Sequence, residues 1–115
     1  MAATLGLLSG STNGKQIKVT ATASAGTTIH TATAGTASID RVWLYAVNSS
    51  ASPVKLTLEW GEAAAPDGNI ETTIQPESGY VLLTSGMQIQ NSLVVKAFAD
   101  TASVIMISGY VFVVS

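Results

Sequence analysis

Short apolar runs follow one another along the chain, and most of them alternate hydrophobic and polar side chains. In the clearest run, residues 54–60, one side holds Val54, Leu56, Leu58 and Trp60 and the other holds Lys55, Thr57 and Glu59. A period of two is typical of a β-strand with one buried face. We therefore expect the first set to face inward and the second set to face solvent.

The same pattern predicts further strands, separated by turn residues such as Gly, Pro, Asn and Ser. The predicted strands are residues 16–22, 27–32, 37–48, 54–60, 70–75, 80–84, 87–90, 93–99 and 103–114. No helix longer than one turn is expected. Strands at this regular spacing are typical of an antiparallel β-sandwich. We expect an all-β fold of about eight strands, jelly-roll-like or immunoglobulin-like, two arrangements that the alternation alone does not separate.

Two positions in these strands carry a further prediction. Around Trp43 both faces of the strand 37–48 are apolar, which predicts a strand that is central in a sandwich or covered by a neighbouring chain. Gly109 interrupts the long apolar strand 103–114, which predicts a bulge or the close approach of another backbone.

The 115 residues fit one domain. Residues 1–14 are rich in small residues and turn signals without a lasting period, so we expect an N-terminal arm at 1–14 and a β-sandwich domain at 15–115. The first residues lack the positive region of a signal peptide. No apolar run is long enough to span a bilayer, so no membrane partner is expected.

Charged residues make up only 10% of the chain, against roughly 25% in an average domain. The five cations are scattered, so no basic patch for nucleic acid is expected. Low charge with high hydropathy indicates that part of the surface is buried against other chains. Long apolar strands at sheet edges with few charges or prolines also favour oligomerisation, and the N-terminal arm could add a strand to a neighbour.

Residues suited to catalysis are few. The single histidine, His30, alternates with Ile29, so we expect it on the polar, solvent-facing side of its strand rather than acting as a general base or pH switch. Asp40 is adjacent to Arg41, which we expect to balance its charge in part. Glu59 and Glu62 flank a strand end without forming a convincing pair for glycoside hydrolysis. We predict no enzymatic activity and no cofactor.

One segment resembles the start of a calcium loop, because oxygen ligands recur at alternate positions in Asp67-Gly-Asn-Ile-Glu71. The complete loop needs a glycine at its sixth position and an acidic residue at its twelfth. Thr72 and Ser78 stand there instead. The segment is therefore interpreted as a turn that enters a strand, and no metal site is expected. No glycine-rich phosphate loop is present either.

Two stretches together resemble a known group of proteins. One is Val42-Trp-Leu-Tyr-Ala-Val-Asn-Ser-Ser-Ala-Ser-Pro-Val-Lys-Leu-Thr-Leu58, and the other runs from Leu93-Val-Val-Lys-Ala-Phe-Ala99 through Val104-Ile-Met-Ile-Ser-Gly-Tyr-Val111. Both are similar to small β-sandwich virion proteins of tailed bacteriophages. The resemblance covers about the last two-thirds of the chain. It implies a structural component of a phage particle, made in the cytoplasm of a bacterial host.

The first functional hypothesis is a capsid decoration, or cement, protein that binds the lattice of the major capsid protein as a homo-oligomer. A trimer at points of three-fold symmetry is favoured. Contact with the shell is predicted for the N-terminal arm, through Leu5, Leu7 and Leu8. Binding only to the assembled shell would stabilise it by mass action.

The second hypothesis is a subunit of the neck, tail, baseplate or fibre, which could recognise host glycans. Tyr80 and Asn69 are the candidate glycan-binding residues. Trp60 is a weaker candidate, because the alternation of its strand places it toward the core. Residues 1–35 match no pattern that would decide the position in the particle.

Overall fold

A computed structural model describes residues 2–115, and these form nine β-strands and no helix. The strands are β1 (Ala3–Gly6), β2 (Ile17–Lys18), β3 (Thr27–Thr31), β4 (Ile39–Asn48), β5 (Val54–Trp60), β6 (Asn69–Ile74), β7 (Val81–Ile89), β8 (Val94–Ala99) and β9 (Ile105–Val114). No helix that could cross a membrane is found among these residues. The predicted all-β fold is confirmed.

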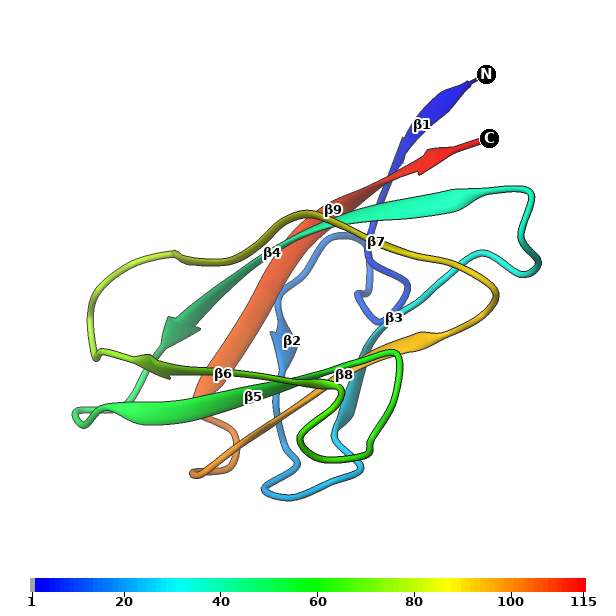
Figure 1. Ribbon diagram of the computed structural model, residues 1–115. Coiled ribbons are helices and arrows are strands. Elements are labelled where there is room, and N and C mark those ends of the chain that lie inside the picture. Colours follow the sequence, from blue (N-terminus) through cyan, green and yellow to red (C-terminus); the bar gives the residue numbers. More distant parts are fainter. Residues whose placement is uncertain (1) are drawn as a thin grey trace.

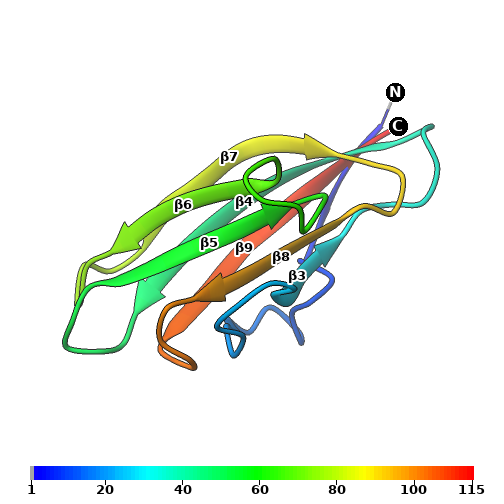
Figure 2. The same ribbon diagram turned by 60° about the horizontal axis from the view of Figure 1, so that its bottom comes forward.

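The strands form two antiparallel sheets that pack face to face (Figures 1 and 2). The first sheet has the order β1-β9-β4-β7, with β2 also paired to β9, and the second has the order β3-β8-β5-β6. Because β4 runs along the whole of β9, β1 and β2 share the other edge of β9, at residues 111–114 and 106–107. The predicted β-sandwich is confirmed.

The strand order also separates the two arrangements that the sequence left open. With β1 and β2 counted as one interrupted strand, each sheet has four strands, and β5 and β6 are the only consecutive strands that pair. In an immunoglobulin fold several consecutive strands are neighbours. The order here is that of an eight-stranded jelly roll.

The core between the sheets is aliphatic, as the composition requires. Its fully buried large side chains include Leu8, Ile29, Leu44, Leu56, Leu58, Ile74, Ile105 and Ile107. Trp60 packs against this core and donates its indole N–H to the Gln88 carbonyl on the other sheet at 3.3 Å. The inward position predicted for Trp60 is confirmed.

β4 is central in its sheet, between β9 and β7. Its inner side chains are buried, whereas Trp43 and Tyr45 lie on the outer face and are half-buried. At Gly109 a β-carbon would lie 1.9 Å from the Trp43 carbonyl oxygen. The prediction of a close backbone approach at Gly109 is confirmed.

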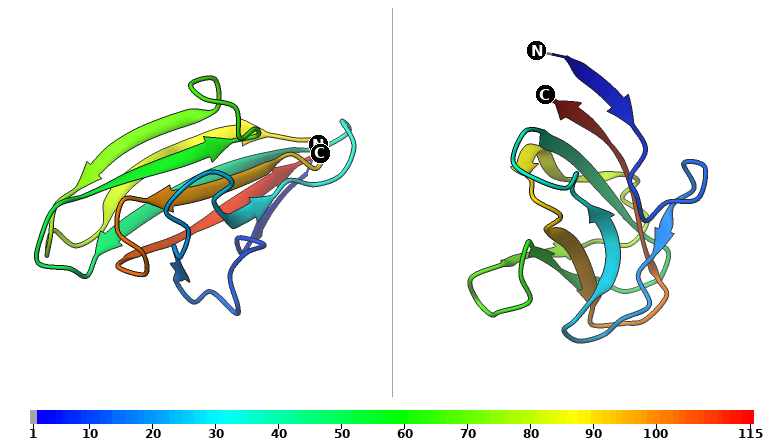
Figure 3. Two further views of the ribbon diagram at one scale, coloured as in Figure 1. Left: turned by 90° about the horizontal axis from the view of Figure 1, so that it is seen from below. Right: turned by 90° about the vertical axis from the view of Figure 1, so that its right-hand side faces the viewer.

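The first residues do not extend away from the sandwich as a free arm. β1 pairs with β9, and Ala2 and Ser115 exchange two backbone hydrogen bonds, so the two ends of the chain lie side by side (Figures 1 and 3). Gly10 donates its N–H to the Ile29 carbonyl of β3. Residues 3–10 therefore run from one sheet to the other.

Two predicted strands, 80–84 and 87–90, are one strand in the structure. β7 continues through the expected turn, and Leu83 and Gly86 are extra residues in its pairing with β4. Gly86 has a φ of 75°, a conformation that glycine adopts without a β-carbon clash. A bulge with such a glycine has the same local sequence signal as a turn.

The solvent-facing prediction for Thr57 and Glu59 is wrong, because both side chains are buried. Glu59 accepts hydrogen bonds from the Ser24 hydroxyl at 2.5 Å and the Gly26 N–H at 2.6 Å. The loop that precedes β3 therefore crosses to the outer side of β5. Alternation predicts two faces of a strand but does not show that a distant loop covers the polar one.

Candidate interaction surface

The outer face of the first sheet carries a cluster of aromatic side chains. Trp43 of β4 stacks on Tyr110 of β9, with ring centroids 5.2 Å apart and ring planes 11° from parallel. Phe112 packs edge-on against both rings. The Arg41 guanidinium lies 5.5 Å from the centre of the Trp43 ring, a cation–π distance.

The most exposed large apolar side chains of the described residues concentrate on this face. Leu5, Leu7, Tyr80 and Leu82 are each more than half exposed. Leu5 lies opposite Phe112 on the neighbouring strand, and Leu82 lies opposite Tyr45. Both leucines therefore lie on the same side of the sheet as these aromatic rings and beside them. We call this surface the aromatic face and define it by Leu5, Leu7, Arg41, Trp43, Tyr45, Tyr80, Leu82, Tyr110 and Phe112.

Two shallow hollows lie on the aromatic face, one on each side of Tyr110. The larger, of about 560 Å³, is lined by Leu5, Gly6, Leu7, Tyr110 and Phe112. The smaller, of about 300 Å³, is lined by Tyr45, Tyr80, Ser108, Gly109 and Tyr110. Partial burial raises the pKa of the Tyr110 hydroxyl above its ordinary value, and the neighbouring Tyr45 hydroxyl adds to the rise.

Charge is almost absent from the strands that form this face. Within β1, β4, β7 and β9 the only charged residues are Asp40 and Arg41. The short strand β2 adds Lys18, which lies opposite Met106 on the outer side of the sheet. Asp40 points into the core and Arg41 points outward, because consecutive residues of a strand face opposite sides. The expectation that Arg41 balances Asp40 is wrong for this reason.

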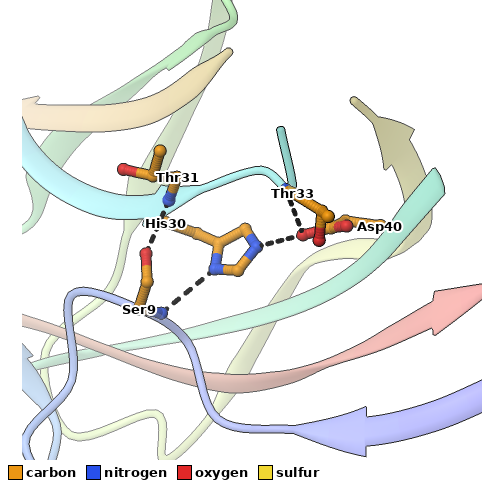
Figure 4. Close-up of polar contacts among 5 residues, drawn as sticks. All are labelled: Ser9, His30, Thr31, Thr33 and Asp40. Atoms are coloured by element: carbon orange, nitrogen blue, oxygen red, sulfur yellow. Dashed lines mark hydrogen bonds and ion pairs between the residues drawn. The ribbon is translucent and has the colours of Figure 1, made fainter. Parts of the chain in front are cut away.

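The partner of Asp40 is His30, which is 4% exposed although it was predicted to face solvent (Figure 4). His30 Nε2 lies 2.7 Å from Asp40 Oδ2, and His30 Nδ1 accepts the backbone N–H of Ser9 at 3.0 Å. A register shift between Thr28 and His30 buries His30 beside Ile29. This bulge breaks the alternation on which the prediction rested.

Ser9, His30 and Asp40 are the residue types of a catalytic triad, but their contacts do not fit that chemistry. The Ser9 hydroxyl accepts the Thr31 N–H at 2.6 Å rather than contacting the imidazole. Both imidazole nitrogens are bonded to protein and the ring is buried, so it has no free position from which to take a substrate proton. The cluster joins the N-terminal segment, β3 and β4.

A third hollow, of about 240 Å³, brings Glu59 and Glu62 together with Lys96. Both carboxylate oxygens of Glu59 are already bonded to the loop that precedes β3. Glu59 is therefore held as a structural acceptor, and the hollow does not present it to a ligand.

The segment that resembles a calcium loop does not gather its oxygen ligands. Glu71 pairs instead with Lys55 at 2.7 Å on the surface of the second sheet. Among residues 2–115 no group of three or more His, Cys, Asp or Glu side chains is placed to hold a metal ion.

The structure divides the predicted site residues. Leu5 and Leu7 lie on the aromatic face, but Leu8 is 2% exposed and packs in the core, so it is not available as a contact for a shell. Tyr80 lies on the same face, in edge contact with Tyr45. Asn69 begins β6 in the other sheet, so it and Tyr80 do not form one site.

Sequence reasoning missed the centre of this surface, which is formed by Trp43, Tyr45, Tyr110 and Phe112. A signal was present, because each of the two strands places aromatic residues two positions apart. β4 and β9 are distant in sequence, however, and only their register brings Trp43 opposite Tyr110.

No protein-family model, curated protein or solved structure matches this chain.

Proposed function

We propose that this protein is a non-enzymatic structural component of a tailed-phage virion, a capsid decoration protein that binds the lattice of the major capsid protein. The observation that carries the proposal is the aromatic face, an almost uncharged surface with several exposed leucines and aromatic rings. Monomeric proteins rarely expose a large contiguous apolar patch, and such patches are typical of protein–protein contacts. The phage assignment rests on the resemblance of residues 42–58 and 93–111.

Two further observations support a structural role over catalysis. The single histidine is buried and bonded through both ring nitrogens. Glu59 is the buried carboxylate of the hollow that it lines with Glu62 and Lys96, and it is bonded through both of its oxygens. The polar groups best placed for chemistry therefore hold the fold together.

Co-sedimentation with empty shells of the candidate major capsid protein tests the proposal. We expect binding that saturates at a copy number related to the shell's symmetry. Leu7→Asp should weaken it at least tenfold, because a carboxylate would be buried in the contact. Leu93→Asp is the matched control, since Leu93 is also exposed but lies directly before β8 of the second sheet. Absence of binding, or equal loss in both variants, would contradict the proposal.

One observation favours the alternative of a neck, tail, baseplate or fibre subunit that binds glycan. The smaller hollow gathers three tyrosines, Tyr45, Tyr80 and Tyr110, and ring faces with hydroxyl groups are suited to sugars. A glycan array that shows selective binding, lost in Tyr80→Ala, would favour this alternative over the decoration role.

A further inference from the structure

We infer that, in the free protein, the aromatic face is covered by the same face of a second copy of this chain, related by a two-fold axis. The self-association does not depend on a capsid. The proposed function is needed only for a second step, in which the capsid shell replaces the second copy on this face.

The sheet edges offer little to a neighbouring chain, which leaves the face as the contact surface. β7 is interrupted by extra residues at Leu83 and Gly86, and bulges of this kind prevent regular pairing at an edge. On β3, Gly10 and Ser9 bond the backbone of Ile29 and Thr31 and so cover the edge.

The two remaining edges are protected in other ways. β6 carries Glu71, which is charged and paired with Lys55. β1 has four residues, and a short edge strand gives a neighbour few hydrogen bonds. We therefore place the contact between copies on the aromatic face and not on the edge strands that the sequence favoured.

The size of the aromatic face fits a stable dimer. The 4, 10, 9 and 10 residues of β1, β4, β7 and β9, at about 3.4 Å per residue and about 4.8 Å between strands, outline roughly 540 Å² of sheet. A standard interface buries about 800 Å² on each partner. The outline is about two thirds of that area, and the side chains that project from the sheet, together with Leu7 beyond the end of β1, add to it.

The chemistry of the face suits a copy of itself. Among the residues that define the face, Arg41 is the one charge and already contacts an aromatic ring. The face offers further rings at Tyr110 and Phe112 to the Arg41 of a partner. Lys18 of β2 adds a cation at the margin of the sheet, opposite Met106. The face offers no carboxylate, so two such faces can meet without an unpaired acid. A contact between identical surfaces is isologous and closes as a dimer.

The trimer favoured from shell symmetry would need two different contact surfaces on each subunit. The described residues present one extended apolar face, and the edges that could form the second surface are protected. This geometry favours a pair over a ring of three.

The test is the mass of the full-length protein by sedimentation equilibrium over a wide concentration range. We expect a monomer–dimer equilibrium. Leu5→Asp and Leu82→Asp, at opposite ends of the face, should each raise the dissociation constant at least tenfold, whereas Leu93→Asp should leave it unchanged. Circular dichroism and cooperative thermal unfolding must show that each variant is folded.

A monomer at all concentrations, a trimer, or a dimer indifferent to Leu5→Asp and Leu82→Asp would overturn the inference. Shell binding separates it from the proposed function. A monomer that binds shells refutes only the inference, and a dimer that ignores shells at every concentration refutes only the decoration role.

Discussion

His30 donates its Nε2–H to Asp40 Oδ2 at 2.7 Å, because its Nδ1 is occupied as the acceptor of the Ser9 N–H. β3 and β4 belong to different sheets, so this buried bond joins the two layers of the sandwich. The second carboxylate oxygen of Asp40, Oδ1, has no hydrogen-bond partner among the described residues. The bond to His30 is thus a main compensation for burying this charge.

His30→Leu should therefore lower the free energy of unfolding by about 3–5 kcal/mol, because it leaves the Asp40 carboxylate buried without its main partner. The double variant His30→Leu/Asp40→Leu should be more stable than His30→Leu alone, since no buried charge remains. Urea unfolding of the two single variants and the double variant gives the coupling energy. Thr28→Ala, at an exposed position of the same strand, should change the stability by less than about 0.5 kcal/mol. Additive effects would show that the two side chains act separately.

Gly109→Ala should destabilise the protein by about 2 kcal/mol or more, because the new methyl group would overlap the Trp43 carbonyl and push β9 from β4. Gly6→Ala is the matched control in the same sheet, since its β-carbon would lie 3.6 Å from Val111, an ordinary contact. Thermal unfolding of both variants measures the difference. Equal stability of the two would mean that β4 and β9 do not approach so closely.

Much of the fold could be predicted because its strands alternate regularly. The predicted range of β5, residues 54–60, agrees with the structure at both ends. β7 was divided in two because Gly86 has the local signal of a turn, and whether the chain turns there depends on pairing with β4. Jelly-roll topology depends on which distant strands pair, and the alternation pattern of a single sequence does not predict those pairs.

The polar interior was harder to predict for a related reason. His30 and Glu59 each occupy a position that alternation assigns to solvent. His30 is turned inward by a bulge, and Glu59 is covered by a loop about 35 residues earlier in the chain. Leu5 and Leu7 were predicted as contact residues from their apolar character alone, and they lie exposed on the aromatic face. Leu8 continues the same run but enters the core, because the chain crosses to β3 at Gly10.

Glu59→Ala should lower the free energy of unfolding by about 1.5–3 kcal/mol, because the Gly26 N–H and the Ser24 hydroxyl lose a charged acceptor. In Glu59→Ala, backbone hydrogen exchange of residues 21–26 should become faster than in the wild type, and exchange in the core should change less. Glu71→Ala is the control, since that carboxylate pairs with Lys55 at the exposed surface and should matter little. Unchanged exchange in residues 21–26 of Glu59→Ala would show that Glu59 does not hold the loop.

The raised pKa of Tyr110 predicts how the stability of the protein changes in alkali. Partial burial and the Tyr45 hydroxyl favour the neutral phenol in the folded state, so above pH 10.0 the unfolded chain loses this proton first. Stability linked to Tyr110 is therefore complete below pH 10.0 and falls as the pH rises through the folded pKa. The urea midpoint of the wild type should fall as the pH rises above 10.0. In Tyr110→Phe it should fall less, because the contribution of the Tyr110 hydroxyl is absent. Lys55, whose pKa is raised by the hydrogen bond to Glu71, titrates in both proteins and cancels in the comparison. Parallel curves for wild type and Tyr110→Phe would show that the Tyr110 hydroxyl titrates alike in the folded and unfolded states.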